Sequence, residues 1–201
     1  QITARTDFSR LPGGIEAAQR AAIAGLLRDK KYGDAQAIWR FLLRRPAPGL
    51  IHDPSFRGME VAPPFGWTLT SSGDIEVQIV PSGMSDHPNA LRVRQFGSLP
   101  SVAAEQSLIL PPGDYLLRYR ARGEHSRASG AFWTIRCTTG KPIAEQPIRA
   151  SDQWTQQSWR FSTPADCPME VIELRGRGRE GGPAPALPVT GLELQGTAAS
   201  G

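Results

Sequence analysis

Arginine is the residue type whose spacing in this chain could carry chemistry. Within residues 90–96, 115–121, 132–137 and 158–161, arginines alternate with apolar residues, and they are Arg92, Arg94, Arg118, Arg120, Arg136 and Arg160. A guanidinium group donates through a planar fork that binds carboxylate or phosphate oxygens in pairs. The spacing therefore predicts a surface that binds acidic groups such as uronate, sulfate or phosphate.

Period-two alternation is typical of half-buried β-strands, and such strands would position the arginines. Successive side chains of a strand point to opposite faces of its sheet. We therefore expect the arginines on one face and an apolar set on the core face, namely Val93, Tyr119, Ile135 and Trp159.

The strands that carry these arginines could share one sheet, and two interpretations of that face are open. In the first, the arginines form a continuous guanidinium platform within reach of Glu105 and Glu173. In the second, the face is solvated and laced with cross-strand arginine–glutamate pairs, each contributing about 0.2–1 kcal/mol. Polar outer faces are common in antiparallel sheets, which favours the second interpretation slightly.

Aromatic side chains could add apolar contacts to the flat faces of sugar rings. Phe132, on the arginine side of its segment, and Trp154, in a turn-like stretch, are the candidates. The remaining tryptophans of alternating segments occupy inward positions, so we expect them in the core: Trp67, Trp133 and Trp159. The predicted ligand site thus consists of Arg92, Arg94, Arg118, Arg120, Phe132, Arg136, Trp154 and Arg160.

No catalytic or metal-binding constellation accompanies these residues in the sequence. The histidines neighbour turn residues and lack the paired spacing of a metal site; they are His52, His87 and His125. A nucleophile elbow and a phosphate-binding glycine loop are also missing from the sequence. We therefore expect no enzyme activity, metal or cofactor. The alternative is a glycoside hydrolase that uses Glu76, Glu105 or Glu173.

Composition limits the domain count and the partners. At 201 residues and 39% hydrophobic, the chain can bury one main core plus a small appendage. A net charge of +4 alongside 19 acidic residues is small for nucleic-acid binding, so we expect no nucleic-acid partner. No apolar run reaches the roughly 18 residues that cross a membrane. The start at Gln1 without methionine suggests a trimmed fragment or mature form.

Residues 14–45 differ from the rest and predict a helical hairpin. Residues 15–27 are rich in helix formers with apolar positions at helical spacing, and a break at 31–34 leads into a second helical segment, 35–43. The second half resembles a tetratricopeptide repeat through its packing residues and closing proline, which are Tyr32, Ala35, Trp39 and Pro46. That resemblance implies contact with a neighbouring repeat or with the β region.

The remainder resembles a family of sugar-binding sandwiches. The resemblance rests on an Asp-Pro-Ser-Phe opening at 53–56, Pro-Phe-Gly-Trp at 64–67, the run 113–121, a Gln-Trp step at 153–154, and the closing 189–194. Over residues 51–196 the pattern is similar to that of jelly-roll carbohydrate-binding modules of the galactose-binding-domain type. The resemblance implies a mainly β jelly-roll sandwich that binds a polysaccharide or oligosaccharide. It does not extend to a calcium site, because residues 188–193 lack the acidic end of such modules.

We therefore divide the chain into a helical hairpin, residues 1–49, and a jelly-roll β-sandwich, residues 50–201. The expected strands are 56–61, 65–70, 74–80, 90–96, 102–110, 113–122, 131–138, 143–149, 155–162, 169–175 and 189–195. Residues 175–183 are too rich in glycine for a strand interior and are expected to form a mobile loop.

The two cysteines, Cys137 and Cys167, both lie in the β region. Cys137 ends an expected strand, and Cys167 lies in the turn 164–168. The sequence leaves two alternatives open, a disulfide between them or two buried thiols. A disulfide would indicate an oxidising compartment, which for a bacterial chain is the periplasm or the cell surface.

The function that these features favour is non-catalytic glycan binding within a larger envelope protein. The arginines indicate an acidic bacterial exopolysaccharide as the ligand. The alternative is a structural module that binds protein partners, in part through the helical hairpin, and has no glycan ligand.

Overall fold

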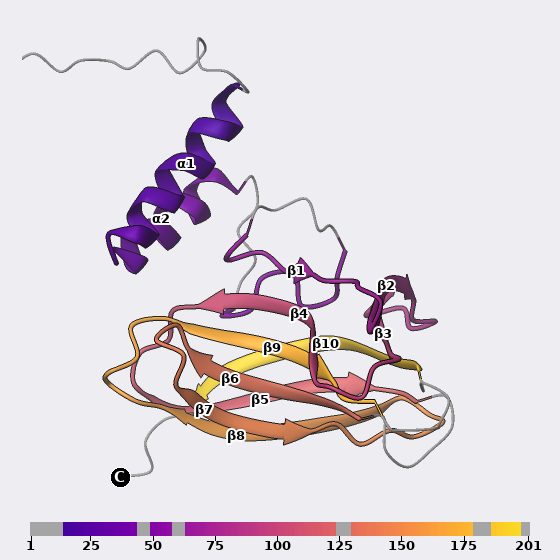
Figure 1. Cartoon of the computed structure of the whole chain (residues 1–201). Coiled ribbons are helices and arrows are strands. Elements are labelled where there is room, and N and C mark those ends of the chain that lie inside the picture. Colours follow the sequence, from indigo (N-terminus) through magenta and orange to yellow (C-terminus); the bar gives the residue numbers. More distant parts are fainter. Residues whose placement is uncertain (1–13, 44–48, 58–62, 124–129, 179–185, 198–201) are drawn as a thin grey trace, which may run out of the picture. The chain divides into compact units, whose positions relative to one another are not determined.

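A computed structural model describes residues 14–43, 49–57, 63–123, 130–178 and 186–197. The chain separates into two compact units, Gln1–Pro46 and Ala47–Gly201, and each is described by itself. The first contains the predicted helical hairpin, and the second contains two β-sheets (Figure 1).

The hairpin consists of α1, Gly14–Arg28, and α2, Tyr32–Leu42. Lys30 adopts a positive φ of 59° in the turn, and the Lys31 amide donates to the carbonyl of Leu26 at 2.8 Å. The second helix therefore begins at Tyr32, earlier than expected. Ala35 and Trp39 lie one turn apart on its buried side. No described helix is long and apolar enough to span a membrane.

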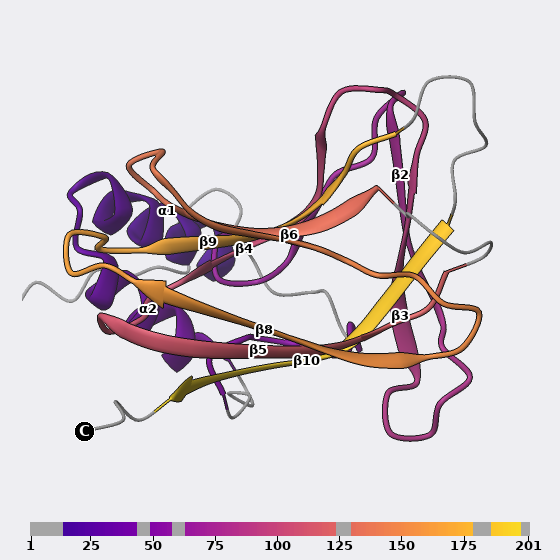
Figure 2. The same cartoon turned by 90° about the horizontal axis from the view of Figure 1, so that it is seen from below.

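The second unit is a sandwich of two antiparallel five-stranded sheets, which lie as separate layers in Figure 2. Sheet A has the order β1 (Thr68–Leu69), β4 (Ser101–Leu108), β9 (Glu170–Gly176), β6 (Ala131–Cys137), β7 (Pro142–Pro147). Sheet B has the order β2 (Ile75–Pro81), β3 (Asn89–Gln95), β10 (Ala186–Thr197), β5 (Gly113–Ala121), β8 (Thr155–Thr163). The predicted mainly β jelly-roll sandwich with an N-terminal helical hairpin is confirmed.

The core lies between the two sheets and is rich in aromatic residues. Each tryptophan that was expected inside is buried, as are the apolar residues that alternate with the arginines: Trp67, Trp133, Trp159, Val93, Tyr119 and Ile135. Trp133 contacts Trp67 and Tyr119, with ring centroids 6.5 and 5.8 Å apart. The alternation therefore predicts correctly which side chains of each strand face the core.

Most expected strands form, and the differences lie near the beginning and near the end of the β region in the sequence. The expected strand 56–61 does not form at residues 56 and 57, and residues 58–61 lie outside the described part. The strand expected at 65–70 is reduced to the two residues of β1, whereas the last strand starts at Ala186. Arg175 and Gly176 belong to β9 instead of a loop, and 179–183 lie outside the described residues.

Cys137 and Cys167 form a disulfide, with their Cα atoms 5.5 Å apart. It joins the end of β6 to the turn between β8 and β9. Of the two alternatives, the disulfide is therefore correct.

Candidate functional site

The predicted arginine platform is divided between the two sheets. Arg92 and Arg94 on β3, Arg118 and Arg120 on β5, and Arg160 on β8 belong to sheet B, whereas Arg136 and Phe132 on β6 belong to sheet A. The prediction of one continuous platform is wrong. Period-two alternation tells which side chains face outward, but both sheets of a sandwich show the same pattern.

On sheet A, Arg136 lies in a charge-balanced network. Its Nε donates to Glu173 at 2.5 Å, and its guanidinium lies 3.6 Å from Glu105. Glu173 also accepts from the Thr134 hydroxyl at 2.9 Å and lies 3.8 Å from Arg175. Two glutamates thus face two arginines, so this network presents no excess of positive charge. The glycoside hydrolase alternative also considered Glu76. This residue lies on β2 of sheet B, whereas Glu105 and Glu173 lie on sheet A.

On sheet B, the arginines of β5 make ion pairs with neighbouring elements. Arg120 lies 3.0 Å from the Asp86 carboxylate, and Arg118 lies 3.7 Å from Glu193 of β10. Side chains of both pairs keep a third or more of their surface exposed. The second interpretation, a solvated face with cross-strand arginine–glutamate pairs, is therefore partly correct for sheet B, where Arg118 and Glu193 form such a pair.

A hollow of about 310 Å³ opens on this face of sheet B. Its polar lining comes from β5, β8, β10 and the loop before β3, through Arg118, Arg120, Gln156, Glu193 and His87, and Gly191 of β10 lies among them. This volume lies at the lower end of the range of small-ligand sites. Of the predicted site residues, the structure brings Arg118 and Arg120 together in this hollow.

A bulge in β10 shapes the hollow. Thr190 pairs with Arg120 and Glu193 pairs with Arg118, so two residues of β10, Gly191 and Leu192, lie opposite the single residue Tyr119 of β5. Gly191 has a φ of 62°, and a Cβ placed on it would lie 2.8 Å from Nε2 of His87. Glycine is therefore required both by the backbone and by the imidazole ring that packs against it.

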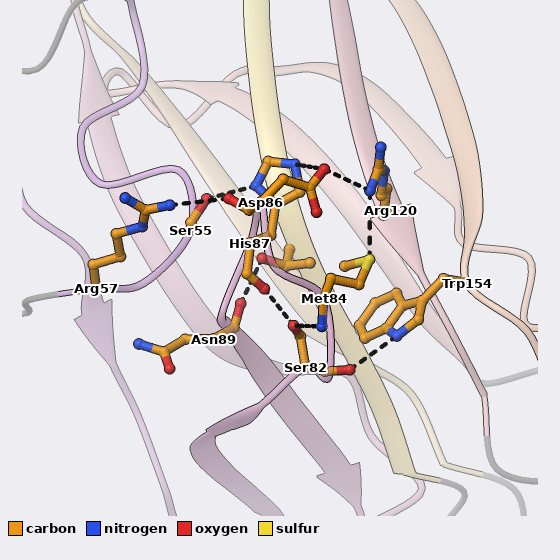
Figure 3. Close-up of polar contacts among 10 residues, drawn as sticks. Ser55, Arg57, Ser82, Met84, Asp86, His87, Asn89, Arg120 and Trp154 are labelled. Atoms are coloured by element: carbon orange, nitrogen blue, oxygen red, sulfur yellow. Dashed lines mark hydrogen bonds and ion pairs between the residues drawn. The ribbon is translucent and has the colours of Figure 1, made fainter.

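The loop of residues 82–88 forms one wall of the hollow through His87, and hydrogen bonds hold the loop in place (Figure 3). The Ser82 amide donates to the Pro88 carbonyl at 2.9 Å, and the Ser82 hydroxyl accepts from the Met84 amide at 2.9 Å. Arg57 donates to the backbone carbonyl of Asp86 at 2.9 Å. Hydrogen bonds within the loop and the hydrogen bond from Arg57 outside it therefore hold this wall in place.

His87 is oriented by the neighbouring loop at residues 52–57. Its Nδ1 and the Ser55 hydroxyl are hydrogen-bonded at 2.9 Å, and its Nε2 lies 3.5 Å from the Asp86 carboxylate. Partial desolvation raises the pKa of Asp86, but the charges of His87 and Arg120 outweigh it and hold the pKa below its ordinary value. Asp86 is therefore ionised at neutral pH and stays available to Arg120.

Each predicted aromatic residue has a guanidinium group over one face of its ring. Trp154 donates from its indole Nε1 to the Ser82 carbonyl at 3.1 Å, and the Arg122 guanidinium lies 5.3 Å from its ring centroid. Phe132 is buried on sheet A, with the Arg177 guanidinium 5.1 Å from its ring centroid. Trp154 thus anchors the 82–88 loop, and Phe132 lies on the sheet opposite the hollow.

Several residues of the hollow were not predicted from the sequence. His87 lies in a loop, as does Asp86, which pairs with Arg120 of the lining, and Gln156 and Glu193 look like ordinary outward positions of strands. One signal was present, because a glycine inside a strand pattern such as Val-Thr-Gly-Leu indicates a bulge. Among the described residues no cluster of three histidine, cysteine or acidic side chains could hold a metal ion.

Comparison with known proteins shows the fold. No protein-family model matches the chain, and no curated protein matches it. A candidate sugar-binding protein from Bacteroides thetaiotaomicron is 12% identical with a TM-score of 0.56, covering 74% of this chain and 100% of its own. A family 61 carbohydrate-binding module, solved with β-1,4-galactotriose, is 13% identical with a TM-score of 0.52, covering 75% and 100%. A family 4 module is 14% identical with a TM-score of 0.52, covering 75% and 99%. The chain thus has the β-sandwich fold of carbohydrate-binding modules.

Proposed function

We propose that the protein is a non-catalytic glycan-binding module that recognises an acidic polysaccharide through the outer face of sheet B. The observation that carries this proposal is the pair of guanidinium groups of Arg118 and Arg120 in one hollow. The two residues are two positions apart on one strand, so their Cα atoms lie about 7 Å from each other, and their side chains could contact a single sugar unit or two linked ones. The Gln156 amide adds a donor and an acceptor for hydroxyl groups.

The fold supports glycan binding, and the charges of sheet B support an acidic ligand. The similar modules share 12–14% of their residues with this chain, so the ligand has to be argued from the side chains present here. On sheet A the arginines are neutralised by Glu105 and Glu173. On sheet B, Arg118 and Arg120 also have acidic partners, Glu193 and Asp86. The excess of positive charge there comes from Arg160 of β8, which makes no ion pair within the described residues.

We further propose that the ligand is a bacterial exopolysaccharide and that the protein works in the periplasm or at the cell envelope. The disulfide between Cys137 and Cys167 supports an oxidising compartment.

One observation favours a second candidate function, protein binding through a tetratricopeptide-like hairpin. Phe41 of α2 is 87% exposed, and Ile38, one turn earlier, is also exposed. Exposed apolar side chains on one helix face are typical of a protein-contact surface. From the sequence, this alternative predicts an exposed apolar patch at hairpin residues such as Ile23, Leu27, Trp39 or Leu43. In the structure Ile23 and Trp39 are buried and Leu27 and Leu43 are half-buried, so the exposed patch consists of other residues.

The test is binding of matched acidic and neutral polysaccharides, measured by isothermal titration calorimetry. The double variant Arg118→Gln/Arg120→Gln should lose at least about tenfold in affinity for the acidic ligand, since a hydrogen bond to a charged group contributes about 1.5–3 kcal/mol. Affinity of the wild-type protein should also fall as salt is raised.

The control is the double variant Arg28→Gln/Arg40→Gln, which removes the same charge from exposed positions of the helical hairpin. It should bind nearly as tightly as the wild-type protein. Equal losses in the two double variants, or no binding of any glycan by the wild-type protein at low salt, would overturn the proposal.

A further inference from the structure

We propose that the hollow on sheet B is a subsite for one hexuronate residue, whose carboxylate takes the place of Asp86 on Arg120 while a ring hydroxyl donates to Glu193. This inference rests on the proposed function and names the sugar class that the same face selects.

The position of the ligand carboxylate follows from the Asp86–Arg120 pair. Asp86 already places a carboxylate oxygen 3.0 Å from the Arg120 guanidinium, with a separation suited to a hydrogen bond (Figure 3). Its side chain is 53% exposed, so it can turn into water without burying a charge. A ligand carboxylate can therefore replace it with the same chemistry, and Asp86 competes with the ligand for Arg120.

Glu193 selects against ligands that offer only negative charge. It lines the hollow beside Arg118, at 3.7 Å, and accepts a hydrogen bond from Gln195 at 2.5 Å. A carboxylate accepts several hydrogen bonds, so it can also accept one from a sugar hydroxyl. Each sulfate or phosphate ester on a sugar replaces a hydroxyl donor with charged acceptor oxygens, which Glu193 would repel. A uronate residue carries both a carboxylate and hydroxyl donors on one ring.

The remaining lining fits a sugar ring. Pro54 and Leu192 supply apolar surface, and Gly191 has no side chain to fill the space. The 82–88 wall is held by Arg57, Ser55 and Trp154, so binding does not have to order it. The two arginines lie on a regular part of β5 that pairs with β8 residue by residue.

The experiment uses two variants that remove the same charge from the two sides of the hollow. Asp86→Asn should raise the affinity for a uronate oligomer about fivefold, because the competing carboxylate is lost. Glu193→Gln should lower it about fivefold, because the charged acceptor of the hydroxyl is lost. The probes are oligomers of galacturonate, glucuronate and mannuronate, each with its methyl ester as the uncharged partner, and dextran sulfate.

The outcomes separate this inference from the proposed function. At least one uronate oligomer should bind the wild-type protein about tenfold more tightly than its methyl ester and more tightly than dextran sulfate. If both variants raise affinity equally, or if dextran sulfate binds best, the face attracts acidic glycans by charge alone and the uronate subsite is wrong. If no acidic glycan binds, the proposed function itself fails. Glu76→Gln on β2 is the charge-matched control, and thermal unfolding of each variant checks its fold.

Discussion

A single carboxyl group in the core, that of Glu170, sets a pH dependence of stability. Its side chain is fully buried at the start of β9, where Oε2 accepts from the Leu110 amide at 3.2 Å and Oε1 has no partner among the described residues. Burial in this apolar surrounding raises the pKa of Glu170 to about 7. The folded protein therefore holds this carboxyl protonated at mildly acidic pH.

Glu170 should make the protein less stable as the pH rises through neutrality. Since its folded pKa lies above the ordinary value of 4.5, its contribution is complete below about pH 4.5 and is lost progressively as the pH rises from there through 7. The loss amounts to about 3 kcal/mol by pH 8. Glu170→Gln should abolish this slope and be the more stable protein at pH 8, as measured by urea unfolding from pH 5 to pH 8.

Glu145→Gln serves as the control, because Glu145 is exposed on β7. It should keep the slope of the wild-type protein. An unchanged slope in Glu170→Gln would contradict the assignment of a raised pKa to this group.

For single residues, the sequence predicts whether a side chain faces the core or the solvent better than it predicts which residue that side chain contacts. The alternation places Trp133 and Ile135 inside and Arg118 and Arg120 outside, and the structure agrees. The pairing of Arg120 with Asp86 joins residues 34 positions apart, and no local pattern encodes it. A buried carboxyl such as that of Glu170 also looks like an ordinary strand residue in the sequence.

Among the elements, β10 does the most to shape the site. Its bulge takes Leu192 into the core, where the Leu192 amide donates to the Pro54 carbonyl at 3.0 Å. Gly191 then makes room for His87. The hollow therefore depends on one irregular step in an otherwise regular strand.

Gly191→Ala should weaken both the fold and the site. A left-handed backbone costs a residue with a Cβ about 1–2 kcal/mol, and the new methyl group would collide with His87. We expect a loss of about 1–2 kcal/mol in the free energy of unfolding and a lower affinity for acidic oligomers. Urea unfolding and calorimetry measure the two effects.

The matched change on the same strand is Gly196→Ala. A Cβ there would lie 3.7 Å from the Tyr115 ring, an ordinary contact, and its φ is not positive. This variant should bind as the wild-type protein does. Equal effects of the two substitutions would show that the bulge does not shape the hollow.

Strand positions could be predicted from the sequence, but sheet membership could not. Consecutive strands β5 and β6 lie in different sheets, and each shows the same alternation of apolar and polar residues. The expected platform fails for this reason at Arg136 and Phe132. The shortening of β1 likewise follows from pairing, since only Thr68 and Leu69 reach partners on β4.

For the whole molecule, the sandwich separates two chemically different outer faces. Sheet A carries the balanced network of Glu105, Arg136 and Glu173. Sheet B carries the hollow with Arg118 and Arg120. Because the core separates them, a ligand that binds one face leaves the backbone of the other nearly undisturbed. The location of binding is therefore the central claim of this account.

Titration of the ¹⁵N-labelled protein with a uronate oligomer, followed by amide chemical shifts, tests that claim most directly. Shifts should gather on β5, β8, the bulge of β10 and the 82–88 loop, with Arg120, Gln156 and Gly191 among the largest. Thr134 and Glu173 on sheet A should stay nearly unchanged. Saturable shifts centred on Thr134 and Glu173, with Arg120 and Gly191 unmoved, would contradict the account and place the glycan on sheet A.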